Sequence, residues 1–237
     1  MENRIINIIE WFNKYDNSEI KIVSKNKEFA IKLNINALPH LLGLQYAYKN
    51  PTNVRGKNIL RQIEKENYSD SDILKNIEIN NPDRLDSVKD RVKYFKAFME
   101  NLEQSNVVEM TNPKTRLKSN YLMIQIDDNT VMQLGIKNLD YEDVFETFII
   151  EKDNLYFKDT TTNEKVISIE KYNEDGELET FSFKENSDIE KENEYEAMQT
   201  DDENSISFVK ESFEPYNYIG FIKENNNNLL LDDEFVR

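Results

Sequence analysis

The sequence predicts an α+β domain in which an N-terminal hairpin and a block of helices precede an antiparallel β-meander packed on the helices. The spacing of the apolar residues is the main reason. These residues alternate with polar ones at 28–35, recur at steps of three and four through most of residues 38–104, and alternate again from residue 120 onward. Each change of period marks a boundary between the hairpin, the helices and the meander.

The N-terminal part is expected to hold a short amphipathic helix over residues 3–15 and a hairpin made of residues 20–23 and 28–35. Asn36 has the position and the side chain to cap the helix that follows the hairpin. Pro39 falls in the first turn of that helix, where a proline is tolerated because its missing N–H has no partner there.

Three further helices are predicted at residues 54–66, 70–79 and 82–104. Ser69 is expected to be the N-cap of the second helix, and Asn81 the N-cap of the third. The third helix has the clearest pattern, since its apolar residues recur on one face and aspartates occupy its first turn. We therefore expect one buried stripe on this helix, with its arginines outside the stripe.

The meander is expected to consist of short strands joined by turns rich in Asp and Asn. These strands are predicted at 121–126, 131–136, 144–150, 154–157, 165–172 and 179–183. Residues 1–184 make up the predicted α+β domain. Residues 185–204 contain few aliphatic side chains and are expected to form an acidic flexible linker, and residues 205–237 an acidic segment with short apolar strands.

The composition excludes several kinds of chemistry. The 237 residues include no cysteine and one histidine, His40, which excludes disulfides, thiolate metal sites, cysteine nucleophiles and sites that need two imidazoles. No glycine-rich phosphate loop or nucleophile elbow is present, and no metal site is predicted. Because the start lacks the features of a secretory signal and no apolar run approaches about 18 residues, we expect a cytoplasmic protein without a membrane partner. The oligomeric state stays open.

Charge is distributed unevenly along the chain, which has 46 acidic and 30 basic residues and a formal net charge of -16. The net charge is +1 over residues 1–48 and +3 over 49–118, but -9 over 119–184 and -11 over 185–237. Such asymmetry is typical of a nucleic-acid-facing surface shielded by an acidic tail, or of an acidic surface aimed at a basic partner. A simple contribution to solubility explains the charge equally well.

His40, in the segment LPHLLGLQ, has two interpretations. Beside Leu41 and Leu42, a lone histidine is most often a packing residue. It is also the only side chain in the sequence whose ordinary pKa, about 6.5, suits proton transfer near neutrality. Helical geometry turns residue 40 toward Gly43 and away from Leu42, and the glycine leaves room either for a ligand or for a neighbouring helix.

Basic and hydroxyl side chains supply candidate contacts to phosphate. The basic candidates are Arg55, Lys57, Arg61, Arg91, Arg116 and Lys118. Guanidinium groups bind phosphate bidentately, which suits a phosphodiester or a dinucleotide pyrophosphate. Each of these residues could equally belong to a solvated face. Tyr121 and Thr147 lie in predicted strands, where they supply either a hydroxyl contact or ordinary strand packing.

Four features occur in order along the chain: EFAIKLNI running into LPHLLGL, Gly56 with ILRQI, DRVKYFKAF, and SNYLMIQ followed later by ETFII. In this order the chain resembles the phage-associated nuclease-like families grouped under the barnase–EndoU–colicin E5/D–RelE fold, in particular the fourth such family. The resemblance covers about residues 20–172. Two positions depart from it: Asn120 replaces the aspartate of an Asp-Tyr-Leu element, and Glu146 replaces a proline before Thr147-Phe148.

The resemblance implies a phage or mobile-element effector, or toxin, that cleaves RNA without a metal ion or other cofactor. His40 would act as general acid or base at a ribose 2′-hydroxyl. Arg91 or Arg116 would stabilise the phosphorane, and Thr147 would position the phosphate. RNA would then be the partner.

Two alternatives stay open. Proteins similar to this group have also been interpreted as ADP-ribosyltransferases, in which case NAD would be the cofactor. Arginines with His40 or Tyr121 would hold the dinucleotide, and Glu146 would stabilise the oxocarbenium-like sugar. The other alternative is a scaffold without catalysis, an acidic inhibitor of the anti-CRISPR kind. Its negative half would occupy the channel of a basic nucleic-acid-binding protein complex.

Overall fold

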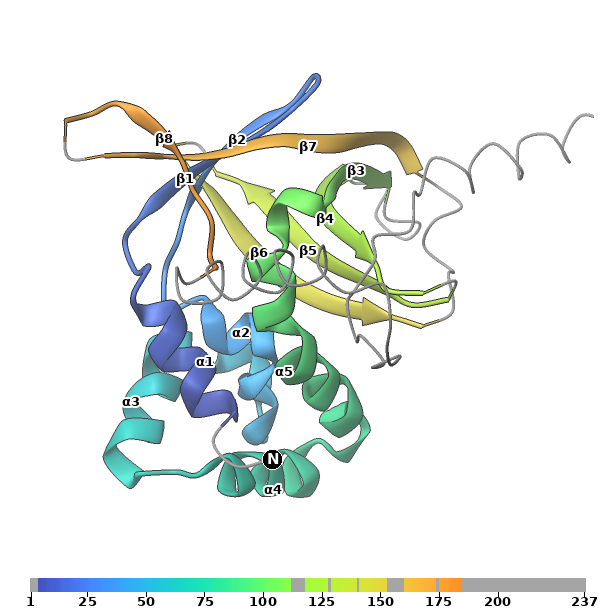
Figure 1. The fold of residues 1–237 in the computed structure, drawn as a ribbon. Helices are drawn as coiled ribbons and strands as arrows, with labels where there is room; N and C mark the ends of the chain where they lie inside the picture. Colours follow the sequence, from blue (N-terminus) through green and yellow to red (C-terminus); the bar gives the residue numbers. More distant parts are fainter. Residues whose placement is uncertain are drawn as a thin grey trace, which may run out of the picture.

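The computed structural model describes residues 4–111, 118–127, 129–139, 141–152, 160–173 and 175–184. Within these ranges the helices gather at one end of a strongly curved β-sheet (Figure 1). The predicted strand at 154–157, the predicted linker at 185–204 and the predicted segment at 205–237 lie outside the described residues. No helix in the described ranges is long and apolar enough to cross a membrane.

The helical end is built from α-helices joined by short 3-10 helices. The α-helices are α1 (Arg4–Asn13), α2 (Leu38–Leu42), α3 (Gly56–Glu66), α4 (Asp70–Asn80) and α5 (Leu85–Glu100). The 3-10 helices are η1 (Leu44–Ala47), η2 (Pro51–Asn53), η3 (Pro82–Arg84) and η4 (Leu102–Gln104). The single helix predicted over 82–104 is therefore divided into η3, α5 and η4, because both ends of the predicted segment wind more tightly.

The predicted helix caps had different outcomes. The prediction for Ser69 is confirmed: its hydroxyl accepts from the amide of Asp72, whose carboxylate accepts in return from the amide of Ser69. The prediction for Asn81 is wrong, since its side-chain amide donates to the carbonyl oxygens of Tyr46 and Tyr48 at 2.7 and 2.9 Å. Asn36 is not a cap either. Its amide groups donate to the side chain of Asn34, and α2 starts without a side-chain cap.

The strands form one sheet whose order is β1-β2-β6-β5-β4-β3-β7-β8. The strands are β1 (Glu19–Ser24), β2 (Glu28–Lys32), β3 (Asn106–Thr111), β4 (Lys118–Gln125), β5 (Val131–Asn138), β6 (Asp143–Glu151), β7 (Thr160–Tyr172) and β8 (Leu178–Thr180). Because β1 also pairs with β7, strands β1 to β7 close on themselves into a barrel and β8 extends one edge.

The α+β class is confirmed, but the predicted antiparallel meander is wrong in its connections. The 13-residue strand β7 pairs antiparallel with β3 through its first half and with β1 through its second half. This draws the N-terminal hairpin into the sheet. The ring closes where β2 meets β6 in parallel at Ile31 and Asp143. Strand β3 was not predicted, and β8 is shorter than the predicted 179–183.

Aromatic rings join the helical end to the sheet. The ring of Phe12 in α1 lies 5.9 Å from that of Phe95 in α5. The ring of Phe148 in β6 lies 5.4 Å from Phe95 and 5.3 Å from Phe98. All four side chains are at most 1% exposed. These contacts bury α5 against the middle of β6, so the position of α5 is fixed relative to the sheet.

A buried carboxylate joins α4 to the start of α1. Asp70 is 4% exposed, and its two oxygens accept from the amides of Ile5 and Ile6 at 2.8 and 3.3 Å. These amides belong to the first turn of α1, where no carbonyl of the same helix can accept from them. The negative charge also complements the positive end of the helix. Asp70 therefore acts as a distant cap that orients α1 on the helical end.

Candidate active site

Helix α2 buries its other side chains and leaves His40 at the surface. Leu38, Leu41 and Leu42 are at most 1% exposed, and Pro39 is buried as well. The imidazole of His40 is half-buried rather than sealed among the leucines. Burial lowers the pKa of His40 below its ordinary value of 6.5. At neutral pH the ring is therefore mostly uncharged and can accept a proton.

Arg91 of α5 lies against the backbone of α2. Its Nη1 is 3.4 Å from the carbonyl oxygen of His40 and 3.5 Å from that of Leu41. Both distances are at the long end of the hydrogen-bond range. The Nε atom of Arg91 is buried and has no hydrogen-bond partner in the described part of the chain. The guanidinium therefore keeps unused donor capacity close to the backbone of His40.

Gly43 is the reason that α5 can approach α2 so closely. Its φ of 81° is left-handed, as is common at a helix C-terminus. A Cβ at this position would lie 3.0 Å from Cγ2 of Val88 and 3.6 Å from Nη1 of Arg91. A side chain here would thus strain the backbone and push α5 away. The glycine in LPHLLGL therefore allows α5, which carries Arg91, to pack closely on the end of α2.

The charge of Arg91 has no acidic counterpart nearby in the described part of the chain. Among the described residues no carboxylate lies within 4 Å of its guanidinium. Burial lowers the pKa of Arg91, Tyr46 opposes that shift and Arg84 adds to it. An arginine nevertheless stays protonated in proteins. The guanidinium carbon of Arg84 lies 5.4 Å from the ring centroid of Tyr46, so two cations adjoin the same tyrosine.

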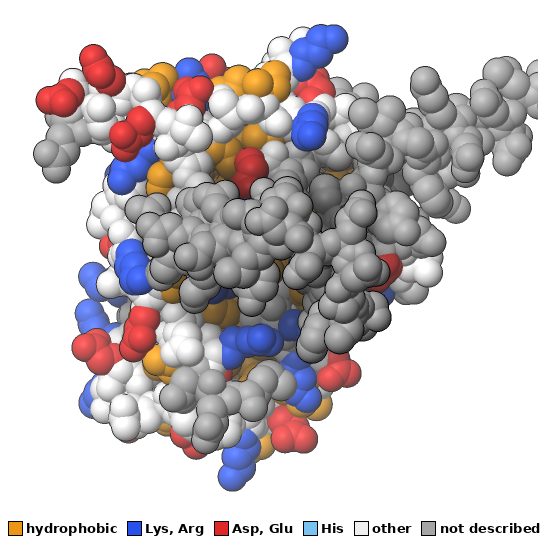
Figure 2. All heavy atoms as spheres, viewed as in Figure 1, with side chains coloured by type: hydrophobic (Ala, Val, Ile, Leu, Met, Phe, Trp, Pro, Cys, Tyr) orange, Lys and Arg blue, Asp and Glu red, His pale blue; other side chains and the backbone are white. Residues whose placement is uncertain are grey.

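We call the group His40, Gly43, Tyr46, Arg84 and Arg91 the cationic corner. Figure 2 shows Lys and Arg side chains interspersed with acidic ones over the helical end of the molecule. The chain is strongly acidic as a whole, but this end of it is not uniformly negative. A partly buried guanidinium without a carboxylate partner in the described ranges, held at the backbone of a residue whose imidazole is neutral, is an arrangement that favours an anion.

Tyr121 and Thr147 are brought together across β5. In the sheet register Tyr121 pairs with Gly135, and Gly135 pairs with Thr147. A Cβ at Gly135 would lie 2.8 Å from Cγ2 of Thr147 and 3.2 Å from Cε1 of Tyr121. Gly135 therefore lets the two side chains approach each other over its backbone. A β-branched or aromatic residue at 135 would separate them.

Strand β6 connects this pair with the cationic corner. Both α2 and α5 contact β6. Leu41 lines a cavity of about 130 Å³ together with Val144 and Phe145. Phe148, the neighbour of Thr147, contacts α5 through its ring. The structure thus brings the predicted site residues into two separate groups, His40 with Arg91 and Tyr121 with Thr147. Successive side chains of a strand point to opposite faces, so Thr147 and Tyr121 face away from α5, on which Phe148 packs.

Glu146 lies at a β-bulge in β6. Gly135 pairs with Thr147 and the next residue, Ile136, pairs with Phe145, so Glu146 has no opposite residue on β5. Its side chain is exposed, and its Oε1 lies 3.2 Å from Nζ of Lys137. This carboxylate is therefore held by a surface ion pair.

The basic candidates on α3 lie beside the start of α2. A Cβ at Gly56 would be 1.8 Å from the carbonyl oxygen of Asn36, so only glycine permits this approach. Arg55 and Lys57 flank Gly56 and are exposed, and Arg61 is exposed one turn further along. Arg116 lies outside the described residues. Lys118 begins β4, and only its backbone is described.

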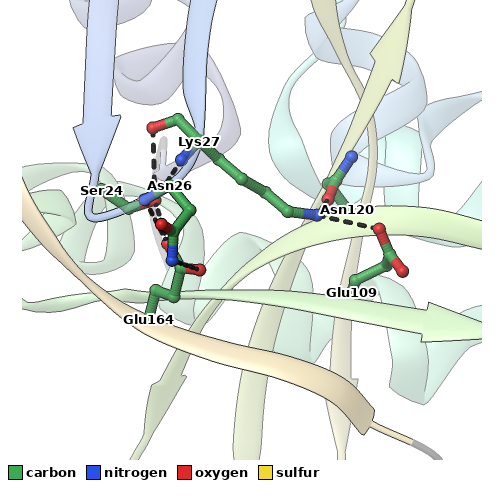
Figure 3. Close-up of polar contacts among 6 residues, drawn as sticks. All are labelled: Ser24, Asn26, Lys27, Glu109, Asn120 and Glu164. Carbon is green, nitrogen blue, oxygen red and sulfur yellow. Dashed lines mark hydrogen bonds and ion pairs between the residues drawn. The ribbon is translucent and has the colours of Figure 1, made fainter.

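A second polar group, not predicted from the sequence, lies where the β1–β2 hairpin meets β3, β4 and β7 (Figure 3). Nζ of Lys27 lies 2.9 Å from Oε2 of Glu109 and 2.5 Å from Oδ1 of Asn120. The carboxylate of Glu164 accepts from Oγ of Ser24 and from the amide and side chain of Asn26, each at 2.8 Å. We call this group the hairpin cluster.

The hairpin cluster contains one of the two positions that depart from the family pattern. Asn120, which replaces an aspartate, accepts from Lys27 and is not part of the cationic corner. Sequence reasoning missed the cluster because a lysine in a turn is normally solvated, and only the sheet closure brings Glu109 and Glu164 to the hairpin. In the described ranges no three acidic or histidine side chains lie close enough together to hold a metal ion.

Comparison with known proteins gives one positive result. The family described as phage-Barnase-EndoU-ColicinE5/D-RelE like nuclease4 matches residues 4–188, which include every described element. No curated protein and no solved structure matches the chain. The match extends beyond the 20–172 range of the resemblance and includes His40, Arg91 and Thr147. Since it covers well over half of the 237 residues, the chain belongs to this family of phage-associated, nuclease-like proteins.

Proposed function

We propose that the protein cleaves RNA by a metal-independent reaction at the cationic corner. The observation that carries this proposal is the guanidinium of Arg91, which is largely buried, lacks a carboxylate partner among the described residues and lies 3.4 Å from the backbone of His40. Burying such a charge without compensation is costly, and a bound phosphate removes the cost. Membership of a nuclease-like family supports the same assignment.

In this proposal neutral His40 removes the proton from the ribose 2′-hydroxyl. The 2′-oxygen then attacks phosphorus, and the guanidinium of Arg91 donates to the oxygens that gain negative charge. The bond to the 5′-oxygen breaks, and the proton held by His40 passes to that leaving oxygen. The products are a 2′,3′-cyclic phosphate and a 5′-hydroxyl end, and the imidazole returns to its neutral form.

The neighbouring residues have supporting roles. The family resemblance gives Thr147 the role of positioning the phosphate, but this side chain faces away from α5, together with Tyr121 across Gly135. The proposal therefore rests on His40 and Arg91 and not on this pair. Arg55 and Lys57 lie beside the start of α2 and would bind flanking phosphates. Because RNA binding relies on cationic contacts, we expect cleavage to weaken steeply as salt rises.

The experiment is a cleavage assay on the full chain in the presence of a chelator, with a fluorescent single-stranded RNA. Wild type should cleave the RNA, and His40→Ala should be slower by about 10²–10⁴-fold because it lacks the general base. Lys75→Ala removes an exposed basic residue of α4 and serves as the control, with unchanged activity. Undiminished cleavage by His40→Ala would refute the proposal.

The two alternatives have less support from the described residues. Transfer of ADP-ribose would need the carboxylate of Glu146 at the bound sugar, whereas this carboxylate pairs with Lys137. An acidic inhibitor would need binding to a basic partner that survives His40→Ala and weakens with salt. Wild-type protein that cleaves no RNA but does bind such a partner would favour the inhibitor.

A further inference from the structure

A cavity in the helical end is lined by η1, α3, α4 and the loop between α3 and α4. Its volume is about 210 Å³. Its apolar wall includes Ile59 and Ile63. The cavity is smaller than the roughly 300–1,000 Å³ of pockets that hold drug-sized ligands, so it fits one ring system rather than a whole nucleotide.

Four polar side chains converge on this otherwise apolar cavity: Tyr48, Gln62, Tyr68 and Asn76. The hydroxyl of Tyr48 donates to Oε1 of Gln62 at 2.8 Å, which fixes the orientation of the Gln62 amide. The side-chain amide of Asn76 and the hydroxyl of Tyr68 have no hydrogen-bond partner in the ranges that the structure describes. A ligand in the cavity would therefore meet two tyrosine rings and several free hydrogen-bonding groups.

This combination is the chemistry that recognises a nucleobase. Bases stack on flat aromatic side chains, and Asn and Gln amides offer a donor and an acceptor side by side to the edge of a base. An aliphatic ligand would not use the amides, and a charged ligand would lack a counter-ion among the residues that line the cavity. A heteroaromatic ring satisfies both the apolar wall and the polar groups.

The cavity also has a suitable position relative to the cationic corner. Gly43 adjoins Arg91, and η1 continues directly from Gly43 to Ala47, which lines the cavity. A 3-10 helix of four residues spans roughly 8 Å, at about 2.0 Å per residue. Stacked nucleotides advance about 3.4 Å each, so about two nucleotides would cover that length.

We infer that this cavity is a nucleobase subsite, which selects RNA by a base about two nucleotides from the bond that is cleaved. This inference rests on the proposed function for its role in RNA selection, but base binding itself does not require catalysis. The inference gives α3, α4 and η1 the task of selecting the RNA sequence that is cut. Apart from Tyr46 in η1, these elements contribute no residue to the cationic corner. We call Tyr48, Gln62, Tyr68 and Asn76 positioning residues, since none of them adjoins Arg91.

The test measures binding of adenosine, guanosine, cytidine and uridine to the full chain by calorimetry or NMR. At least one nucleoside should bind to wild type. Asn76→Ala and Gln62→Ala should each weaken its binding by roughly three- to tenfold, the effect of one lost hydrogen bond. Asn58→Ala removes an exposed amide of α3 outside the cavity and should change binding less than twofold. Ala47→Leu should fill the cavity and abolish binding.

A cleavage assay with the same variants then connects the cavity to RNA. Asn76→Ala should lose preference between RNA sequences while the rate on its poorest substrate stays the same. His40→Ala should lose cleavage but bind nucleosides as wild type does, which separates this inference from the proposed function. Absence of nucleoside binding to wild type, or equal binding by wild type and Ala47→Leu with both proteins folded, would overturn the subsite even if RNA is cleaved.

Discussion

The hairpin cluster and the cationic corner are both partly withdrawn from solvent, but their charges are balanced differently. In the hairpin cluster Lys27 lies between Glu109 and Asn120, and the carboxylate of Glu164 accepts three hydrogen bonds. In the cationic corner Arg91 makes two long contacts to carbonyl oxygens and has no carboxylate partner among the described residues. The first arrangement pairs its own charges, whereas the second leaves a cation that the proposed RNA phosphate would neutralise.

This difference separates two kinds of polar group that look alike in the sequence. Lys27, Glu109 and Glu164 connect the hairpin to β3, β4 and β7, so their loss should affect stability. Arg91 of α5 makes only a long contact to the backbone of His40 in α2, which contributes little to stability. Loss of either side chain should therefore affect activity more than stability. Measuring both the stability and the RNA cleavage of variants in each group tests whether the hairpin cluster is structural and the cationic corner functional.

After His40→Ala, the largest effect is expected for Arg91→Ala. Removing one preorganised donor to a developing charge costs about 10²–10³ in rate, and we expect RNA cleavage to fall by that factor. Arg91→Lys should recover only part of the loss, because an ammonium group does not bind phosphate bidentately. Thermal unfolding should show both variants to be at least as stable as wild type. A large loss of stability instead would place Arg91 with the structural group.

A smaller effect, on stability rather than rate, is expected for Lys27→Met. Removing the cation breaks the partly buried ion pair between Lys27 and Glu109 and the hydrogen bond to Asn120, which should lower the free energy of unfolding by about 1–3 kcal/mol. The double variant Lys27→Met with Glu109→Gln should recover part of that loss. Chemical denaturation measures both, and RNA cleavage at a temperature where both are folded should equal that of wild type.

Glu164→Gln should have a still smaller effect. The hydrogen bonds from Ser24 and Asn26 lower the pKa of Glu164, so the carboxylate is the favoured form in the folded protein. Such a group stabilises the fold above its unfolded pKa, and that contribution is lost as the pH falls through the lowered folded pKa. The group is largely solvated, so we expect about 1 kcal/mol at pH 7. Denaturation at pH 7 and pH 3 should show the variant's deficit shrinking in acid.

The smallest effect is expected in the pH dependence of His40. Since burial lowers its pKa, cleavage should rise with pH and have its midpoint below pH 6.5. The unfolded chain binds the proton more readily, so the contribution of neutral His40 to stability is lost as the pH falls from about 6.5 through the folded pKa. His40→Gln should remove that slope. An activity midpoint above 6.5 would contradict the burial of the ring.

The sequence predicted the local elements well because local spacing determines them. The hairpin, the cap at Ser69 and the apolar stripe of α5 follow from residues within a few positions of each other. The closed barrel could not be predicted in this way. Alternation shows that β7 is a strand, but not that it is shared between β3 and β1.

The arrangement of the candidate site depended even more on distant contacts. Helical spacing turned His40 toward Gly43, but nothing in the spacing indicated that Arg91 would reach the backbone of His40 from another helix. The approach of Tyr121 to Thr147 depends on the register of β4, β5 and β6 and on the bulge at Glu146. Gly135, which makes that approach possible, looks like an ordinary strand residue in the sequence.

The most direct test of the account is the identity of the cleavage products. The substrate is an RNA oligonucleotide of mixed sequence, incubated with the full chain and a chelator and compared with a copy that carries 2′-deoxyribose at the main cleavage position. We predict fragments that end in a 2′,3′-cyclic phosphate, with no cleavage at the deoxy position and none by His40→Ala. Cleavage at the deoxy position, or fragments that carry a 5′-phosphate, would contradict attack by a 2′-oxygen at the cationic corner.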